Sequence, residues 1–213
     1  MDQGAWIALL WGAWTTIWIS GVSIVIGLFA GLGVAMLRGA RIPVISQFMA
    51  LYISVVRATP LITLVLFLFV AASYLGWSID RALIAIAALT INTTAFNAEI
   101  WRSAFETFPR EQIEASKAAG MTKGLMLRRI MLPQMTVTSL PPLVNEMTGL
   151  VKASPAIAMV GLVDLTRVTN RITAVTFEPL PPILAAGLFY ILIIGVLVRL
   201  QRKADKYAQR LAM

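Results

Sequence analysis

The chain has 213 residues, of which 59% are hydrophobic and only 13% are charged, and its mean hydropathy is +0.82. Soluble domains carry about 25% charged residues, so most of this surface is not expected to face water. The chain has no cysteine and no histidine, which excludes disulfides, thiolate or histidine catalysis and the commonest metal ligand. A membrane protein without a catalytic or metal site is therefore expected, and the net charge of +8 is attributed to membrane topology rather than to nucleic-acid binding.

Five apolar segments are long enough to cross a bilayer, whose hydrocarbon core takes about 20 helical residues. The first follows Asp2, where a cleavable signal would carry a basic residue, so it is expected to be a retained span. A sixth apolar stretch, 156–165, is too short to cross and is expected at the surface. The sequence predicts an all-α membrane protein with a single transmembrane domain over residues 1–213. The predicted spans are 10–37, 46–75, 81–101, 135–153 and 182–199.

Lysines and arginines gather after the first, third and fifth spans, which all end on one side if the spans alternate. Cytoplasmic loops carry an excess of Lys and Arg, so the N-terminus is expected outside and the C-terminus inside. The opposite side holds only Arg81, Arg167 and Arg171. The basic side carries Arg38, Arg41, Arg102, Arg110, Lys117, Lys123, Arg128, Arg129, Arg199, Arg202, Lys203, Lys206 and Arg210.

Gly27 and Gly31 form a GxxxG step inside the first span. Such a step lets two helices approach closely, although the two glycines are also explained if the span simply tolerates them.

The polar segment of about 107–133, between the third and fourth spans, reads as helix, sharp turn, helix. Pro109 suits the start of a helix, and Gly120 suits the left-handed position that ends it. Thr122 is placed to cap a second helix that runs to about Leu132, and Pro133 marks the junction with the next span.

The first of these two helices is rich in small side chains, including Ala115, Ser116 and Ala119. A helix with small side chains can press its backbone into the groove of a partner, and Glu114 can offer a charge to basic groups there. The alternative is an ordinary amphipathic hairpin at the membrane surface.

Six residues of this hairpin have the spacing of a known sequence motif: Glu114, Ala115, Gly120, Ile130, Leu132 and Pro133. The set resembles the EAA cytoplasmic loop of ABC-importer permeases, with serine as the third residue of the triplet. Other stretches resemble the polar amino acid uptake branch of these permeases. They are RATPL at 57–61, NAEIWRSAFETFPREQIEAS at 97–116, LPPLVNEMTGLVKAS at 140–154 and GLVDLTR at 161–167.

The resemblance implies a permease subunit of the bacterial cytoplasmic membrane that imports polar amino acids or related solutes by alternating access. Its partners would be an ATPase dimer, a second permease, identical or paralogous, and an external solute-binding protein. ATP and magnesium would be bound by the ATPase, because this chain has no P-loop and is not expected to be an enzyme. The implied ATPase contacts are Glu114, Ala115, Ser116, Ala119 and Gly120.

The resemblance also implies a short external helix at about 156–172, with Asp164 and Arg167 as candidate contacts for the binding protein.

Ionisable residues within spans usually face a cavity or a charged partner. An amino acid carries a carboxylate, which suits Arg57 or Lys152, and an ammonium, which suits Glu99 or Glu146. The alternative is that these groups pair with one another and fix the helices. Pro141 and Pro142 are expected to interrupt the fourth span, which favours 145–154 as a substrate-contact segment. The substrate-path candidates are Arg57, Thr59, Glu99, Asn145, Glu146, Lys152 and Ser154.

Three other functions remain open from the sequence. A channel, or a scaffold in a complex without an ATPase, would share the composition and would differ by not co-purifying with an ATPase. An intramembrane enzyme would need an acidic pair such as Asp80 and Asp164, which are both expected at the external surface. An exporter would share the spans but not the external helix.

Overall fold

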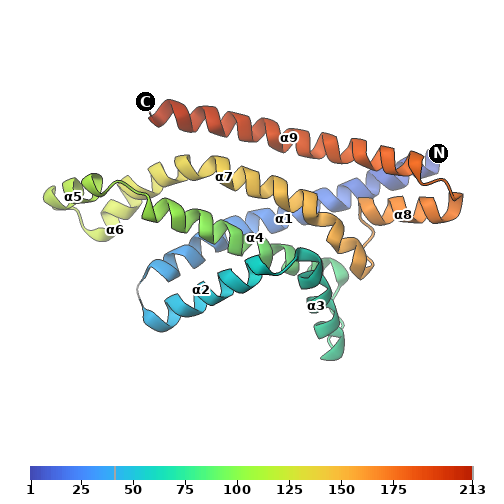
Figure 1. Cartoon of the computed structure of the whole chain (residues 1–213), viewed down its shortest axis with the longest axis horizontal. Helices are drawn as coiled ribbons and strands as arrows, with labels where there is room; N and C mark the ends of the chain where they lie inside the picture. The colour runs from blue at the N-terminus through green and yellow to red at the C-terminus, as the bar shows by residue number, and fades with distance from the viewer. Residues whose placement is uncertain (41, 213) are drawn as a thin grey trace.

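The computed structural model describes residues 1–40 and 42–212, with side chains as far as residue 208, and all regular secondary structure in this part of the chain is helical (Figure 1). A π-helical turn, Leu127–Met131, precedes α7, and a 3₁₀ helix, Ser154–Val160, follows it. The α-helices are α1 (Gln3–Gly39), α2 (Pro43–Ala58), α3 (Leu61–Tyr74), α4 (Arg81–Glu106), α5 (Arg110–Ala118), α6 (Lys123–Met126), α7 (Leu132–Ala153), α8 (Leu165–Thr176) and α9 (Leu180–Ala212).

Among the described residues, α1, α4 and α9 are each long and apolar enough to cross a membrane alone. The number rises to five if each of two bent helix pairs counts as one span. The all-helical membrane fold predicted from the sequence is therefore confirmed.

The predicted second span, 46–75, is wrong as a single helix, because α2 and α3 meet at an angle of 108°. The bend lies at Thr59, whose backbone is extended with φ −90° and ψ 125°. Pro60 causes it, since the ring of a proline disfavours helical geometry in the preceding residue.

The stretch 156–165 was expected at the surface, and this is wrong. Its first half, 156–160, belongs to the 3₁₀ helix in the core, where Ile157 is fully buried against Ile19 and Leu89, and Leu165 at its end is also fully buried. The predicted helix at 156–172 is also divided, because Gly161 turns the chain with φ +86° before α8 begins.

The close packing of α1 on α4 organises the core. A Cβ atom added to Gly27 would lie 2.2 Å from Thr93 Cγ2, and one added to Gly31 would lie 2.6 Å from Asn97 Cβ. The GxxxG step is therefore a site of close helix contact, and neither glycine is merely tolerated.

The helix α7 runs unbroken through Pro141 and Pro142, so the interruption predicted there is wrong. Both prolines lack an N–H, which leaves the carbonyls of Val137 and Thr138 without their usual helical donors.

The two ends of the molecule carry different segments. Figure 1 places the α5–α6 hairpin and the C-terminal end of α9 at one end, and the N-terminus and α8 at the other. A cluster of buried side chains, including Ala35, Trp101 and Met135, packs with Met126 and Met131 and so fastens the hairpin to the long helices.

Candidate functional site

A cavity of about 470 Å³ lies where the end of α2, the middle of α4 and the end of α7 meet. Its polar and aromatic lining comes from Arg57, Thr59, Asn92, Phe96 and Glu146. Three of the seven substrate-path candidates, Arg57, Thr59 and Glu146, therefore come together around one space.

Local geometry places these side chains. The break at Thr59 and Pro60 stops α2 beside α4, so that the last turn of α2 and the first residue of α3 both line the cavity. On α7, Glu146 lines it together with Gly149, Leu150 and Ala153. These positions are spaced i, i+3, i+4 and i+7, which is one face of a helix.

An ion-pair cluster lies directly beside the cavity, centred on Glu99 of α4. The Glu99 carboxylate lies 3.2 Å from Arg38 Nη1, 2.6 Å from Arg102 Nη2 and 3.8 Å from Arg57 Nη1. Arg102 also pairs with Glu106. The expectation that Arg57 and Glu99 form an ion pair is therefore confirmed, and Glu99 belongs to this cluster rather than to the cavity wall.

The guanidinium of Arg57 belongs to both sites. Its Cζ lies 5.3 Å from the centre of the Phe96 ring, which is within cation–π range. By contrast, Glu146 makes no ion pair with any side chain in the described part of the chain.

The other candidates on this segment lie elsewhere. Asn145 and Lys152 are exposed and share a different face of α7 from Glu146, since seven residues separate them. Ser154 is fully buried, and its hydroxyl donates to the carbonyl of Val151 at 2.8 Å. These three residues therefore do not line this cavity, and the proposal that 145–154 contacts the substrate stays a prediction for them.

Sequence reasoning missed Asn92 and Phe96. A signal was present, because Asn92, Phe96 and Glu99 are spaced i, i+4 and i+7 and so share one face of α4.

The α5–α6 hairpin presents a small, flat surface. Glu114, Ala115, Ala119 and Gly120 are exposed, whereas Ser116 is buried and donates its hydroxyl to the carbonyl of Gln112 at 2.6 Å. This bond stays within α5, so the serine side chain is turned away from the exposed surface.

The turn of the hairpin has the expected chemistry. Gly120 has φ +73°, in the left-handed region, and ends α5. The Thr122 hydroxyl accepts from Leu125 N at 3.3 Å and caps α6.

At the opposite end of the molecule, Asp164 is fully buried and does not lie at the surface as expected. Its Oδ1 accepts from Arg167 N at 2.9 Å and so caps α8, while Arg167 Nη1 donates to the Ala158 carbonyl at 2.9 Å. The side chain of Asp164 is therefore structural, and its predicted contact with a partner protein is wrong.

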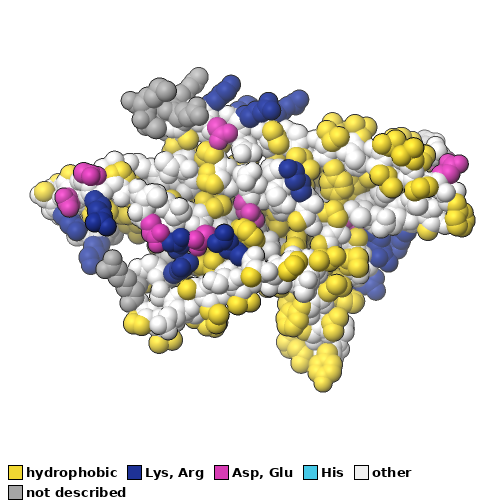
Figure 2. Space-filling view, in the orientation of Figure 1, with side chains coloured by type: hydrophobic (Ala, Val, Ile, Leu, Met, Phe, Trp, Pro, Cys, Tyr) yellow, Lys and Arg dark blue, Asp and Glu magenta, His cyan; other side chains and the backbone are white. Residues whose placement is uncertain are grey.

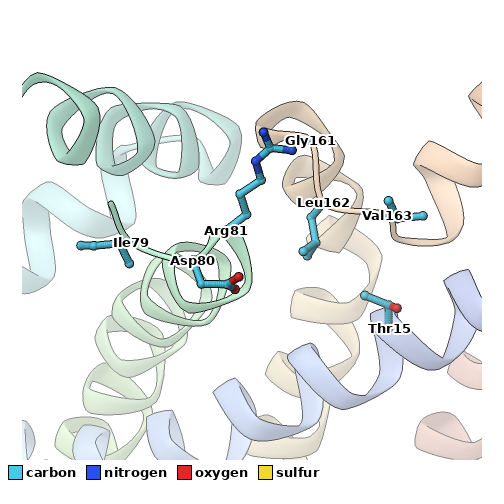
Figure 3. A pocket seen from close by; sticks show the side chains of 7 residues that line it. All are labelled: Thr15, Ile79, Asp80, Arg81, Gly161, Leu162 and Val163. Carbon is cyan, nitrogen blue, oxygen red and sulfur yellow. The ribbon is translucent and has the colours of Figure 1, made fainter. Parts of the chain in front are cut away.

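A second cavity of about 500 Å³ lies near Asp164 and is lined by Thr15, Asp80, Arg81 and Gly161 among others (Figure 3). Asp80 caps the start of α4, and the Arg81 side chain extends toward Gly161 (Figure 3). Asp80 and Asp164 each cap a different helix, which does not support a catalytic acidic pair.

Residues 23–208 match the model of one protein family, described as the binding-protein-dependent transport system inner membrane component. The chain belongs to this family. The resemblance noted from the sequence is thereby confirmed, and the chain is an inner membrane permease component rather than an enzyme.

Similar proteins have related descriptions. The arginine transport system permease protein ArtQ of Bacillus subtilis is 31% identical over 93% of this chain and 91% of its own length. The nopaline transport system permease protein NocM of Agrobacterium fabrum is 30% identical over 90% of this chain and 83% of its own.

Solved structures agree with this assignment. A chain from the crystal structure of an amino acid ABC transporter with histidines superimposes with a TM-score of 0.88 and 27% identity, over 97% of this permease and 98% of that chain. The fold is also that of the inward-facing MetNI methionine ABC transporter, with a TM-score of 0.79, 21% identity and 99% coverage of both chains. These relatives do not favour a channel or a scaffold that lacks an ATPase.

Proposed function

We propose that this permease is the membrane subunit of an ABC importer that moves polar amino acids or related solutes into the cytoplasm by alternating access. The observation that carries the proposal is the cavity in which a cationic Arg57 and Glu146, which has no ion-pair partner among the described side chains, face the same space. An amino acid has one charge of each sign, so both ends of the solute find a partner there.

The two charged groups have different availability. Arg57 is already shared with Glu99 at 3.8 Å, which is a loose ion pair, and 41% of its side chain is exposed. A substrate carboxylate would compete with Glu99 for this guanidinium. Glu146 forms no ion pair with a described side chain, so its carboxylate is open to an ammonium or guanidinium group. Thr59 and Asn92 add neutral polar groups to the wall.

The orientation follows from charge. The α5–α6 hairpin and the end of α9 lie at one end of the molecule and, with the π-helical turn after α6, carry 10 of the 18 lysines and arginines. The positive-inside tendency supports placing this end in the cytoplasm, and therefore the N-terminus and α8 outside.

The exposed surface of Glu114, Ala115, Ala119 and Gly120 is the proposed contact for an ATPase dimer that would bind ATP and magnesium. A movement of α5 can be transmitted to α7, because Gln134 Nε2 of α7 donates to Gln112 Oε1 of α5 at 2.8 Å. The buried cluster around Met126, Met131 and Trp101 connects the same hairpin to α1 and α4.

The external cavity beside α4 is the proposed contact for a solute-binding protein, in place of Asp164. Asp80 and Arg81 offer one charge of each sign at its rim, and its volume of about 500 Å³ would admit a partner side chain. A second permease subunit, identical or paralogous, would complete the translocation path on the face that carries Asn145 and Lys152.

The direct test is uptake by vesicles that contain this permease with an ATPase and a binding protein encoded beside it. We expect uptake of a radiolabelled amino acid only when ATP is inside with the ATPase and the binding protein is outside. Solute flow without ATP or ATPase would contradict the proposal and favour a channel.

The hairpin provides a second test through two substitutions at one position. The left-handed backbone of Gly120 is costly for valine but is tolerated by asparagine, and no atom lies within 4 Å of an added Cβ. Gly120→Val should therefore lower transport-linked ATP hydrolysis at least about fivefold, whereas Gly120→Asn should retain most of it. Equal ATPase activity in both variants would reject the coupling role of this turn.

A further inference from the structure

We propose that the exposed face of α9 binds an anionic phospholipid of the cytoplasmic leaflet, whose headgroup contacts Arg199, Arg202, Lys203 and Lys206. The inference rests on the membrane location and orientation proposed above and is independent of which solute is carried.

The four basic residues form a stripe on one side of α9. At about 100° per residue, their side chains fall within an arc of about 100°. All four are exposed, whereas Ala204 is buried and lies on the opposite side of the helix. The stripe therefore points away from the helix bundle, and Figure 2 shows Lys and Arg side chains along the outer edge of α9 toward its C-terminal end.

The same face is apolar earlier in the helix. Leu184, Leu188, Leu192 and Val196 lie on it and are 63%, 53%, 59% and 64% exposed. The change from apolar to basic occurs within one turn, between Val196 and Arg199. A helix face that is first apolar and then basic complements an anionic phospholipid, because the acyl chains contact the apolar part and the headgroup contacts the basic part.

The depth of the stripe agrees with this match. About 20 residues separate Leu180 from Arg199, which spans about 30 Å and so equals the hydrocarbon core. Arg199 to Lys206 covers a further 10 Å or so, whereas each headgroup layer is about 5–8 Å deep. Arg199, Arg202 and Lys203 fall within that layer, and the long side chain of Lys206 can reach back to it.

The charge of the stripe requires an anionic partner. Among the described side chains, none of the four basic groups forms an ion pair. Asp205 lies at the edge of the stripe, nearest to Arg202, and is the one acidic residue between 199 and 208. An apolar groove of about 420 Å³ between α1 and α9 reaches this face at Leu192 and Val196 and offers a place for an acyl chain.

The test uses the absence of cysteine from the chain. A Leu200→Cys variant accepts a single fluorophore one residue beyond Arg199, and it is assembled with its ATPase and placed in vesicles. Fluorescence quenching by brominated phosphatidylglycerol is compared with quenching by brominated phosphatidylcholine. We expect phosphatidylglycerol to be preferred, with the preference falling about fivefold for each charge removed by Arg202→Gln or Lys203→Gln.

Two control variants distinguish the stripe from general charge. Lys203→Arg keeps the charge and should keep the preference, and Arg171→Gln removes a charge at the other end of the molecule and should leave it unchanged. Equal quenching by both lipids in the unsubstituted protein would overturn the proposal. So would a preference that appears only without the ATPase, because the stripe would then be an ATPase contact. Uptake by the same vesicles tests the proposed function separately.

Discussion

Two carboxylates on facing helices, Glu99 of α4 and Glu146 of α7, differ in how many cations surround them. Glu99 contacts three arginines that come from α1, α2 and α4, and only 24% of its side chain is exposed. Glu146 lines a cavity and pairs with none of the described basic groups. A carboxylate surrounded by cations holds helices together, whereas one that faces an open space is available to a cation from outside.

Arg57 joins these two regions, because it contacts Glu99 and also lines the cavity. Binding of a substrate carboxylate would therefore weaken one of the contacts that fix the end of α2. The two regions are distinct in role but are not independent.

The largest effect is expected on stability, from Glu99→Ala. Removal of the shared partner leaves Arg38 and Arg57 without their acidic partner, close to Arg102, which keeps only its pair with Glu106. Breaking a fully buried pair in this way costs about 3–5 kcal/mol. Because Glu99 is partly exposed, we expect a loss of about 2–3 kcal/mol in the free energy of unfolding, seen as a lower thermal transition in lipid.

The matched control is Glu106→Ala, which removes one carboxylate from an exposed pair with Arg102. A helical pair of this kind contributes about 0.3–0.5 kcal/mol. Equal destabilisation by the two substitutions would show that Glu99 has no special structural role.

The next largest effect is expected on uptake, from Glu146→Gln. The substitution keeps the size of the side chain but removes the charge that would meet a substrate ammonium. A hydrogen bond to a charged group contributes about 1.5–3 kcal/mol, which corresponds to a loss of uptake of about 10- to 100-fold. The measurement is uptake at subsaturating solute in vesicles, with complex assembly followed by co-purification of the ATPase.

Glu178→Gln provides the control, since Glu178 is exposed in the loop before α9 and lies outside the cavity. Full uptake by Glu146→Gln would show that the charge of Glu146 is not needed for substrate binding. Loss of assembly would instead make Glu146 a structural residue like Glu99.

Local features of this fold were predictable from the sequence. The long apolar runs predicted the three long helices α1, α4 and α9, and the positions of Gly120 and Thr122 predicted the turn and the cap of the hairpin. These features depend on residues close together in the chain, where helix-ending and capping rules apply directly.

The cavity was only partly predictable because it depends on contacts between distant segments. Arg57 and Glu146 were recognised as candidates, but their meeting depends on the bend at Thr59 and on the packing of α2 and α7 against α4. The burial of Asp164 could not be seen for the same reason, since it results from the packing of α8 against α1.

The smallest expected effect comes from Phe96→Leu, which tests whether Arg57 is positioned for the cavity or held only by Glu99. The ring of Phe96 lies beneath the guanidinium, and a cation–π contact at a partly exposed site contributes about 0.5–1 kcal/mol. We expect the apparent solute affinity to fall about two- to fivefold, with the thermal transition nearly unchanged. Phe96→Tyr keeps an aromatic ring and should keep the affinity. If Phe96→Leu instead lowers stability and leaves the affinity intact, Arg57 belongs to the structural cluster alone, and only Glu146 would remain as a charged contact for the substrate.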